Sequence, residues 1–342
     1  MEMVTLGKTG ITVNKNGFGA LPIQRVSIDD AVALARRAYE AGMTFFDTAR
    51  FYTDSEEKLG EAFDGMREKV CIATKTAAQN AEDFWKDLEV SLHNLRTDYI
   101  DIYQFHNPSF CPQPGGEDGL YDAALKAKEQ GKIRHISITN HRLTVAHQAI
   151  DSGLYETLQF PFSYLAGEQE MELVQKCREK NMGFIAMKGM AGGLIQDGIT
   201  AAAWMDTQEG VVPIWGVQRE SELDQFLRCI REGAELTKER LETIEKDREE
   251  LCGEFCRGCG YCMPCPAGIE INQCARMSLM LRRAPAAAWL TESWQQKMHQ
   301  IENCLHCGHC MSKCPYGLNT PELLQANYED YWKVLEESKK EK

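Results

Sequence analysis

Two short runs of cysteines near the C-terminal end of the chain could do metal or redox chemistry. The runs are Cys256-x2-Cys259-x2-Cys262-x2-Cys265 and Cys304-x2-Cys307-x2-Cys310-x3-Cys314, and a proline follows each of them. Three thiolates at this spacing can wrap one corner of a cubane, while a fourth that precedes a proline binds the other cluster in two-cluster proteins. The sequence therefore predicts two [4Fe–4S] clusters.

Structural zinc is the alternative, because paired C-x2-C units in intracellular proteins also bind zinc. A zinc site has no use for a third cysteine at the same step or for a proline after the fourth. The first run departs from the second, since two residues rather than three separate Cys262 from Cys265. Cys252 stands close enough in sequence to replace a ligand of the first cluster.

Four ionisable residues nearer the N-terminus form a second candidate site: Asp47, Tyr52, Lys75 and His106. A tyrosine with the ordinary pKa of about 10 is a poor proton donor at neutral pH, but a neighbouring ammonium group favours its phenolate. Lys75 could supply this charge and Asp47 could keep Lys75 protonated. His106 could orient a substrate oxygen or relay the proton.

The elements that must position these residues are alternating strands and helices. Between about residues 15 and 232, eight short apolar runs alternate with amphipathic stretches, which is typical of βα units and a parallel sheet. Eight units in this length predict a (β/α)8 barrel, in which chemistry lies at the C-terminal ends of the strands. No G-x-G-x-x-G opens a helix after the first strand, so a Rossmann site has no support. The expected strands are 16–21, 44–47, 70–74, 99–105, 133–139, 157–160, 183–187 and 211–217, and the clearest helices are 28–40, 82–95 and 171–180.

The chain is expected to have two domains joined by a helix. Residues 1–234 form the barrel, and residues 235–250 form a charged, solvated linker helix. Residues 251–342 form a helical two-cluster domain with a polar tail. Its helical patterns at 272–283 and 286–301 separate the two cysteine runs by too much chain for a compact fold of hairpins.

Composition excludes several classes of function. The chain has 342 residues and a formal net charge of -13, which argues against nucleic acid and anionic membranes as partners. We expect a cytoplasmic protein, because the N-terminus lacks the pattern of a signal peptide and no apolar run is long enough to span a bilayer. The scattered cysteines are then expected to be reduced side chains of the core: Cys71, Cys111, Cys177 and Cys229.

The spacing around the ionisable residues resembles the aldo-keto reductase family. The resemblance rests on DTARFY at 47–52, ATKT at 73–76 and DYIDIYQFH at 98–106, with LGKTG at 6–10 and GFG at 17–19 upstream. It covers about residues 3–232 and implies a catalytic tetrad in which Tyr52 is the general acid. The combination with a ferredoxin-like tail resembles a bacterial iron–sulfur subgroup of that family.

The resemblance also implies where a nicotinamide cofactor would bind. Thr139 and Asn140 take the place of the family's usual Ser-Asn pair, and Gln159 would stack on the ring or bond to it. Members that bind NADP hold its 2′-phosphate with basic residues after the eighth strand, but Glu222 stands here, and its carboxylate would repel a phosphate. We therefore expect NADH rather than NADPH, although Arg219 could compensate. The other expected cofactor contacts are Lys188, Gly216 and Gln218.

Two arginines point to an anionic substrate. Arg25 follows the first strand and Arg50 lies inside the 47–52 loop, so both could face the barrel mouth, where a guanidinium binds carboxylate or phosphate. Both could equally be ordinary surface or ion-paired arginines.

Three functions are compatible with this sequence. The first is a carbonyl or alcohol oxidoreductase that uses NAD(H), with clusters that exchange electrons with a ferredoxin, a flavodoxin or a bound flavin. The second is a plain reductase with a structural cluster domain. The third is an iron–sulfur electron-transfer protein or a redox-neutral lyase that uses the barrel site without nicotinamide. The substrate and the oligomeric state cannot be read from the sequence.

Overall fold

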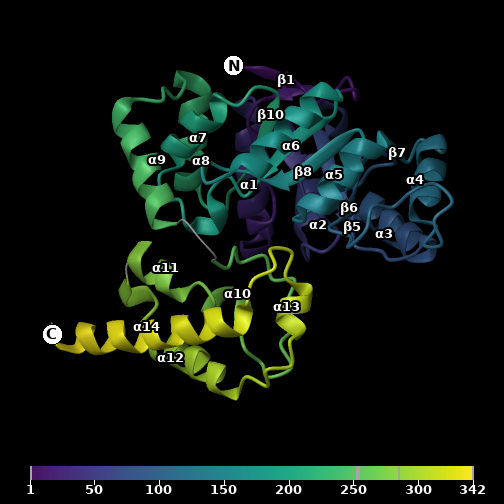
Figure 1. Ribbon diagram of the computed structural model, residues 1–342. Helices are drawn as coiled ribbons and strands as arrows, with labels where there is room; N and C mark the ends of the chain where they lie inside the picture. Colours follow the sequence, from purple (N-terminus) through teal and green to yellow (C-terminus); the bar gives the residue numbers. More distant parts are fainter. Residues whose placement is uncertain (1, 252–254, 284–285, 341–342) are drawn as a thin grey trace. The chain divides into compact units, whose positions relative to one another are not determined.

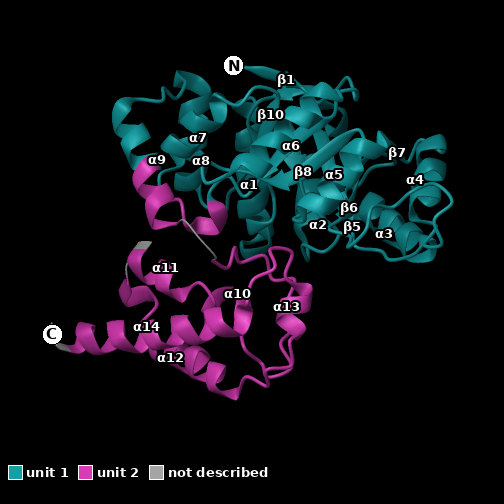
Figure 2. Cartoon of the chain, in the orientation of Figure 1, with its two compact units in different colours: residues 1–190, 197–244 teal, residues 191–196, 245–342 magenta. Residues whose placement is uncertain are grey.

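The computed structural model describes residues 2–251, 255–283 and 286–340. The chain divides into two compact units (Figure 2): Met1–Met190 with Asp197–Ile244, and Ala191–Gln196 with Glu245–Lys342. The division at residues 244 and 245 lies inside the stretch 235–250 that was predicted as a linker helix, and the short segment 191–196 belongs to the second unit. None of the described helices has the length and apolar character needed to cross a membrane.

The first unit is a closed barrel of eight parallel strands surrounded by helices (Figure 1), which confirms the predicted (β/α)8 fold. The barrel closes where β10 pairs with β3. Nearly every strand residue is buried, as expected for a parallel sheet that helices cover. The strands are β3 (Gly17–Gly19), β4 (Phe45–Asp47), β5 (Cys71–Thr76), β6 (Ile100–His106), β7 (Ile133–Thr139), β8 (Thr157–Pro161), β9 (Gly183–Met187) and β10 (Val211–Gly216).

Helices follow the strands and pack around them. Three of these helices have an N-cap residue whose side chain accepts a hydrogen bond from a backbone N–H of the first turn. These residues are Ser27 before α1, Asn80 before α3 and Asp197 before α7. The helices are α1 (Ile28–Glu40), α2 (Ser55–Ala62), α3 (Ala81–Asn94), α4 (Leu120–Glu129), α5 (Leu143–Ser152), α6 (Glu168–Glu179), α7 (Gly198–Asp206) and α8 (Glu220–Glu232). Short 3-10 turns lie at η1 (Pro22–Arg25), η2 (Arg67–Lys69) and η3 (Ala191–Gly193).

A hairpin that the sequence did not reveal packs on the interior of the barrel. Strands β1 (Met3–Thr5) and β2 (Thr12–Asn14) pair antiparallel, and Val4, Leu6 and Val13 join the buried cluster that includes strand residues such as Phe45. Gly7 has a φ of +52°, and a Cβ there would lie 2.4 Å from the Gly183 nitrogen at the start of β9. Only glycine allows this approach, which fixes the hairpin on the N-terminal end of a barrel strand.

The second unit is helical, as expected. Its elements are α9 (Lys238–Glu250, which begins in the first unit), α10 (Ile271–Cys274), α11 (Met277–Arg283), η4 (Ala286–Ala288), α12 (Glu292–His299), η5 (Gln300–Asn303), α13 (His309–Lys313) and α14 (Thr320–Lys340). Helix α14 contacts α10, α11, α12 and α13 (Figure 1), and its Leu324, Tyr331 and Leu335 are buried in the apolar core of the unit.

The helix expected at 272–283 is broken into α10 and α11. The buried side chain of Asn327 on α14 binds both sides of the break: its Oδ1 accepts from Ser278 N–H at 2.8 Å, and its Nδ2 donates to the Ala275 carbonyl at 3.3 Å. An amide from a distant helix therefore replaces the backbone hydrogen bonds that are lost between the two segments.

Candidate active site and cluster sites

The four predicted acid–base residues lie at the C-terminal end of the barrel strands. Asp47 is the last residue of β4, Lys75 lies near the end of β5, and His106 is the last residue of β6. Tyr52 follows β4 in the turn that leads into α2. This is the end of a (β/α)8 barrel at which active sites are found.

A buried ion pair joins Asp47 and Lys75. The Lys75 Nζ lies 2.5 Å from Asp47 Oδ1 and donates to the Thr48 carbonyl at 2.6 Å, while Gln104 Nε2 donates to Asp47 Oδ2 at 3.1 Å. Burial raises the pKa of Asp47 and lowers the pKa of Lys75, and in each case the charge of the partner opposes the shift. The two charges therefore depend on each other in a site that water does not reach.

Tyr52 and His106 lie beside this pair. The Lys75 Nζ is 5.2 Å from the centroid of the Tyr52 ring, and the rings of Tyr52 and His106 meet edge to face with centroids 5.7 Å apart. Burial, helped by the charge of Lys75, lowers the pKa of His106 to about 3. The imidazole is thus neutral near pH 7 and can donate one hydrogen bond and accept another.

An unsatisfied amide lies next to the acid–base residues. Gln159 of β8 is completely buried and close enough to Asp47 to favour its carboxylate. Neither its Nε2 nor its Oε1, however, makes a hydrogen bond of normal geometry with any residue that the structure describes. Thr139 pairs with Gln159 in register on the adjacent strand. A donor and an acceptor left without partners fit a carboxamide such as that of nicotinamide.

The side chain of Asn140, which follows β7, makes hydrogen bonds to the backbone of two loops. Its Oδ1 accepts from the backbone N–H groups of His141 and Arg142, and its Nδ2 donates to the Pro108 carbonyl at 2.8 Å. The side chain therefore holds together the loops that follow β6 and β7.

The expected cofactor contacts after β9 and β10 lie in two loops. Lys188 follows β9 with a φ of +59° and is half-buried, while Gly216 ends β10 and is exposed. The Glu222 carboxylate, in the first turn of α8, accepts from Gln218 N–H at 2.9 Å. A carboxylate thus occupies the helix N-terminus, where an anion is favoured.

The two arginines differ in their surroundings. The Nη1 of Arg50 lies 2.9 Å from Glu56 Oε2, and the Arg50 side chain remains 29% exposed. Glu56 is itself buried and accepts from the Thr74 hydroxyl at 2.6 Å. Arg25, at the end of η1, is exposed. The structure therefore ties Arg50 to a buried carboxylate.

Sequence reasoning missed two buried polar residues that support the site. Gln104 holds Asp47, and Glu56 holds Arg50 and Thr74. The signal for Gln104 was its place inside an otherwise apolar strand, two residues before His106. Glu56 lies in the first turn of α2, where an acidic residue is also expected as a helix-stabilising group.

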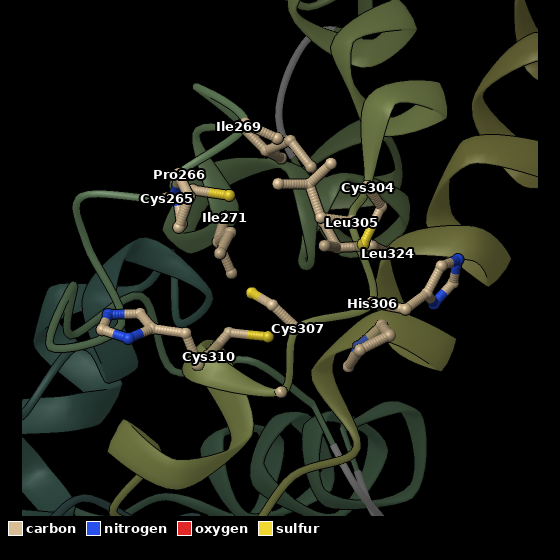
Figure 3. A pocket seen from close by; sticks show the side chains of 14 residues that line it. Cys265, Pro266, Ile269, Ile271, Cys304, Leu305, His306, Cys307, Cys310 and Leu324 are labelled. Atoms are coloured by element: carbon tan, nitrogen blue, oxygen red, sulfur yellow. The ribbon is translucent and has the colours of Figure 1, made fainter.

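The eight cysteines of the two runs line two pockets. The first pocket is lined by Cys256, Cys259 and Cys262 together with Cys314 from the second run. The second pocket, shown in Figure 3, is lined by Cys304, Cys307 and Cys310 together with Cys265 from the first run. The last cysteine of each run thus crosses to the other pocket, which is the exchange that two-cluster proteins use.

The remaining cysteines are separate from these pockets. Cys71, Cys111, Cys177 and Cys229 are buried in the barrel unit, and burial raises the pKa of each thiol. They are neutral thiols at physiological pH. Cys252, the alternative ligand, lies outside the described residues.

Comparison with known families matches both units. Residues 15–209 match the model of the aldo/keto reductase family, and residues 255–319 match a 4Fe–4S dicluster domain. The chain belongs to the aldo/keto reductase family and is an oxidoreductase of that type. The second match assigns the cysteine pockets to iron–sulfur clusters rather than to zinc.

Individual relatives agree with this assignment. Over 216 residues the chain is 31% identical to an L-galactose dehydrogenase of Arabidopsis thaliana, covering 58% of this chain and 68% of that protein. It is 28% identical over 229 residues to aldo-keto reductase YhdN of Bacillus subtilis, covering 58% of this chain and 65% of that protein, just under two thirds of its length.

Solved structures share the fold. An aldo/keto reductase of Klebsiella pneumoniae in complex with NADP and acetate aligns with a TM-score of 0.61 and 23% identity, over 72% of this chain and 95% of that one. The holo form of AKR11C1 of Bacillus halodurans aligns with a TM-score of 0.62 and 20% identity, over 72% and 96%.

The crossed arrangement of the cysteines predicts which pairs of substitutions remove one cluster and which remove both. Cys259→Ala with Cys314→Ala alters one pocket, whereas Cys307→Ala with Cys314→Ala alters both. Of about eight irons per chain, we expect the first double variant to keep about four after anaerobic purification and the second to keep almost none. Iron and acid-labile sulfide analysis measures this difference.

The two double variants carry equal numbers of substitutions, so general destabilisation would affect them alike. Cys274→Ala is the control, because Cys274 is buried in the same unit but lines neither pocket. Equal iron contents in the two double variants would contradict the crossed arrangement.

Proposed function

We propose that this chain interconverts a carbonyl and an alcohol in a small substrate at the mouth of its barrel, with NAD(H) as hydride carrier. We further propose that its two [4Fe–4S] clusters exchange electrons with a one-electron carrier such as a ferredoxin or a flavodoxin. The observation that carries the first part is the buried pair of Asp47 and Lys75 beside the Tyr52 ring. A polar group of this kind is costly to bury and is typical of a catalytic site.

Each side chain has a role in the proposed proton transfer. The ammonium of Lys75 favours the phenolate of Tyr52, so the hydroxyl can give its proton to a developing alkoxide. Asp47, held by Gln104, keeps Lys75 protonated despite its burial. Neutral His106 donates a hydrogen bond that orients the substrate oxygen.

The buried amide of Gln159 supports a nicotinamide site next to these residues. Gln159 and Thr139 would exchange hydrogen bonds with the carboxamide. Asn140 would donate the second N–H of its Nδ2, since the first is given to the Pro108 carbonyl. When it is bound there, nicotinamide supplies the hydride. The chain's own contribution is to hold the carboxamide and to exclude water from the buried pair.

Arg25 and Arg50 support an anionic substrate. Arg50 shares its charge with Glu56 and keeps part of its guanidinium exposed, and Arg25 is exposed. A carboxylate or phosphate substrate would pair with these groups.

Kinetic variants separate the two proposed roles. Tyr52→Phe should lower kcat by about 10²- to 10⁴-fold through loss of the general acid while the Kd for the cofactor stays the same. Arg50→Ala should raise KM for acidic substrates more than it lowers kcat. Steady-state kinetics with acidic and neutral carbonyl compounds measure both effects.

Tyr39→Phe, on α1, is the matched control and should keep its activity. Full turnover by Tyr52→Phe would exclude the proposed general acid, and an unchanged KM in Arg50→Ala would exclude an anionic substrate held by that residue.

Glu222 supports NADH as the preferred cofactor, because its carboxylate lies where family members that hold a 2′-phosphate carry a basic residue. The Klebsiella pneumoniae structure contains NADP, so the preference is a proposal about this chain's own residues.

Cofactor titration tests this preference. We expect a Kd for NADH at least about tenfold below that for NADPH, equal to about 1.4 kcal/mol of discrimination. Glu222→Gln keeps an oxygen that can accept from the Gln218 N–H but removes the negative charge. This variant should bring the Kd values for NADH and NADPH closer together. Comparable Kd values for the two cofactors in the unmodified protein would refute the preference.

Coupling between the barrel and the clusters needs a mediator. A hydride carries two electrons, whereas each cubane normally passes one, so a bound flavin or an outside carrier would have to divide the pair. A plain reductase with a structural cluster domain would contain the same two-cluster domain and is one alternative. A redox-neutral lyase or a pure electron-transfer protein is the remaining alternative.

Anaerobic absorbance distinguishes these functions. If the barrel and the clusters are coupled, NADH should bleach the cluster absorption near 400 nm within the time of turnover. Bleaching by reduced ferredoxin but not by NADH would favour the electron-transfer or lyase function. Carbonyl reduction that leaves the clusters oxidised and unresponsive to both donors would favour a structural cluster domain.

A further inference from the structure

A buried cation, Arg276, lies in the cluster unit and has no carboxylate partner among the residues that the structure describes. Its side chain is 5% exposed and follows α10 at the break before α11. The Nη2 donates to the Gly192 carbonyl at 2.7 Å and lies 3.2 Å from the sulfur of Met280, while the Nε has no partner among the described residues. A buried guanidinium without a carboxylate is unusual, because desolvation of the charge is costly.

The guanidinium lies against the loop that forms the first cluster pocket. Gly258 stands between the ligands Cys256 and Cys259, and its N–H donates to Cys256 Sγ at 3.4 Å. A Cβ at Gly258 would lie 2.4 Å from Arg276 Nη1, and one at Gly192 would lie 3.1 Å from the same atom. Two glycines thus leave the space that the guanidinium fills beside the cysteine loop.

Among the described residues, the lining of the second cluster pocket includes no equivalent cation. Its lining contains no lysine or arginine, only His306 and His309 among basic side chains, and its ligand Cys307 is exposed. Arg257 also lines the first pocket, but it is half-buried and stacks on the rings of Phe255 and Tyr316. Arg276 is not part of that lining but lies behind the cysteine loop, against Gly258, and it is the more deeply buried of the two cations.

We propose that Arg276 raises the reduction potential of the cluster bound by Cys256, Cys259, Cys262 and Cys314, with little effect on the other cluster. Reduction adds one negative charge to a cluster, and a fixed cation nearby stabilises that charge most where water is excluded. The hydrogen bond to Gly192 holds the guanidinium in place. The proposal deepens the proposed function, since it rests on the two clusters, but it requires neither nicotinamide nor a carbonyl substrate.

A redox titration followed by electron paramagnetic resonance tests this role, with dithionite as reductant and mediator dyes. In Arg276→Gln, the equilibrium constant for reducing the first cluster should fall at least about tenfold, equal to about 59 mV for one electron. The second cluster should keep its potential. Arg276→Lys retains the positive charge, so the first cluster should keep a reduction potential close to that of the unmodified protein.

Two further variants keep the test decisive. Arg282→Gln removes an exposed arginine that pairs with Asp330 in the same unit, and it should leave both potentials unchanged. If Arg276→Gln loses iron, Gly192→Ala is the second variant, because its Cβ would lie 3.1 Å from Arg276 Nη1 but 3.4 Å from the Arg257 carbonyl oxygen. It should push the guanidinium away and lower the same potential by a smaller amount. The Cys314→Ala protein identifies which signal belongs to the second cluster.

Unchanged potentials in an Arg276→Gln protein with full iron content would overturn the proposal, as would equal shifts in both clusters. Because the titration contains no nicotinamide or substrate, either outcome is independent of whether the barrel performs carbonyl chemistry.

Discussion

The contact between Lys75 and Asp47 is the constraint on which the barrel site depends. Two opposite charges lie 2.5 Å apart in a place where burial disfavours both of them. Such a pair adds little to the stability of a fold, but removal of one partner leaves the other as an uncompensated buried charge. The neighbouring groups are arranged around this pair. Gln104 donates a hydrogen bond to the second carboxylate oxygen of Asp47, and the Thr48 carbonyl accepts a hydrogen bond from the Lys75 ammonium. The same ammonium contributes to the lowered pKa of His106.

The cluster unit also has to stabilise buried charge, in this case the negative charge of its clusters. Each cluster is anionic with its four thiolates, and acidic side chains are absent from the stretches 255–269 and 303–317, although the chain as a whole is strongly acidic. A buried guanidinium, that of Arg276, lies behind the cysteine loop of the first pocket, and the second pocket has an exposed ligand, Cys307. Two sites with nearly the same ligand pattern therefore have different surroundings, which is how proteins give similar clusters different potentials.

Much of this architecture could be predicted from the sequence because the signals were local. The strands at Ile133–Thr139 and Gly183–Met187 and the helix at Ile28–Glu40 were predicted to the residue, since apolar periodicity and a capping serine mark them directly. The β1–β2 hairpin was missed because strands of three residues have no periodicity to detect. The break between α10 and α11 was missed because its cause, Asn327, lies about fifty residues further along the chain. The four tetrad residues were predicted from the spacing of their motifs. No such spacing marks Gln104, Glu56 and Arg276, whose partners come near them only when the chain folds.

The crossing of the cysteines has a consequence for how the C-terminal unit is held together. Because Cys314 joins the first pocket and Cys265 joins the second, each cluster ties positions from both runs and so closes a long loop of chain. A covalent cross-link that closes a loop of roughly sixty residues removes about 4 kcal/mol of chain entropy from the unfolded state in the simplest model. The two clusters thus act as two cross-links between the same two segments of the chain. Oxygen that destroys one cluster would remove one of the two loop closures, so the unit would become less stable even while the other cluster keeps its four cysteines.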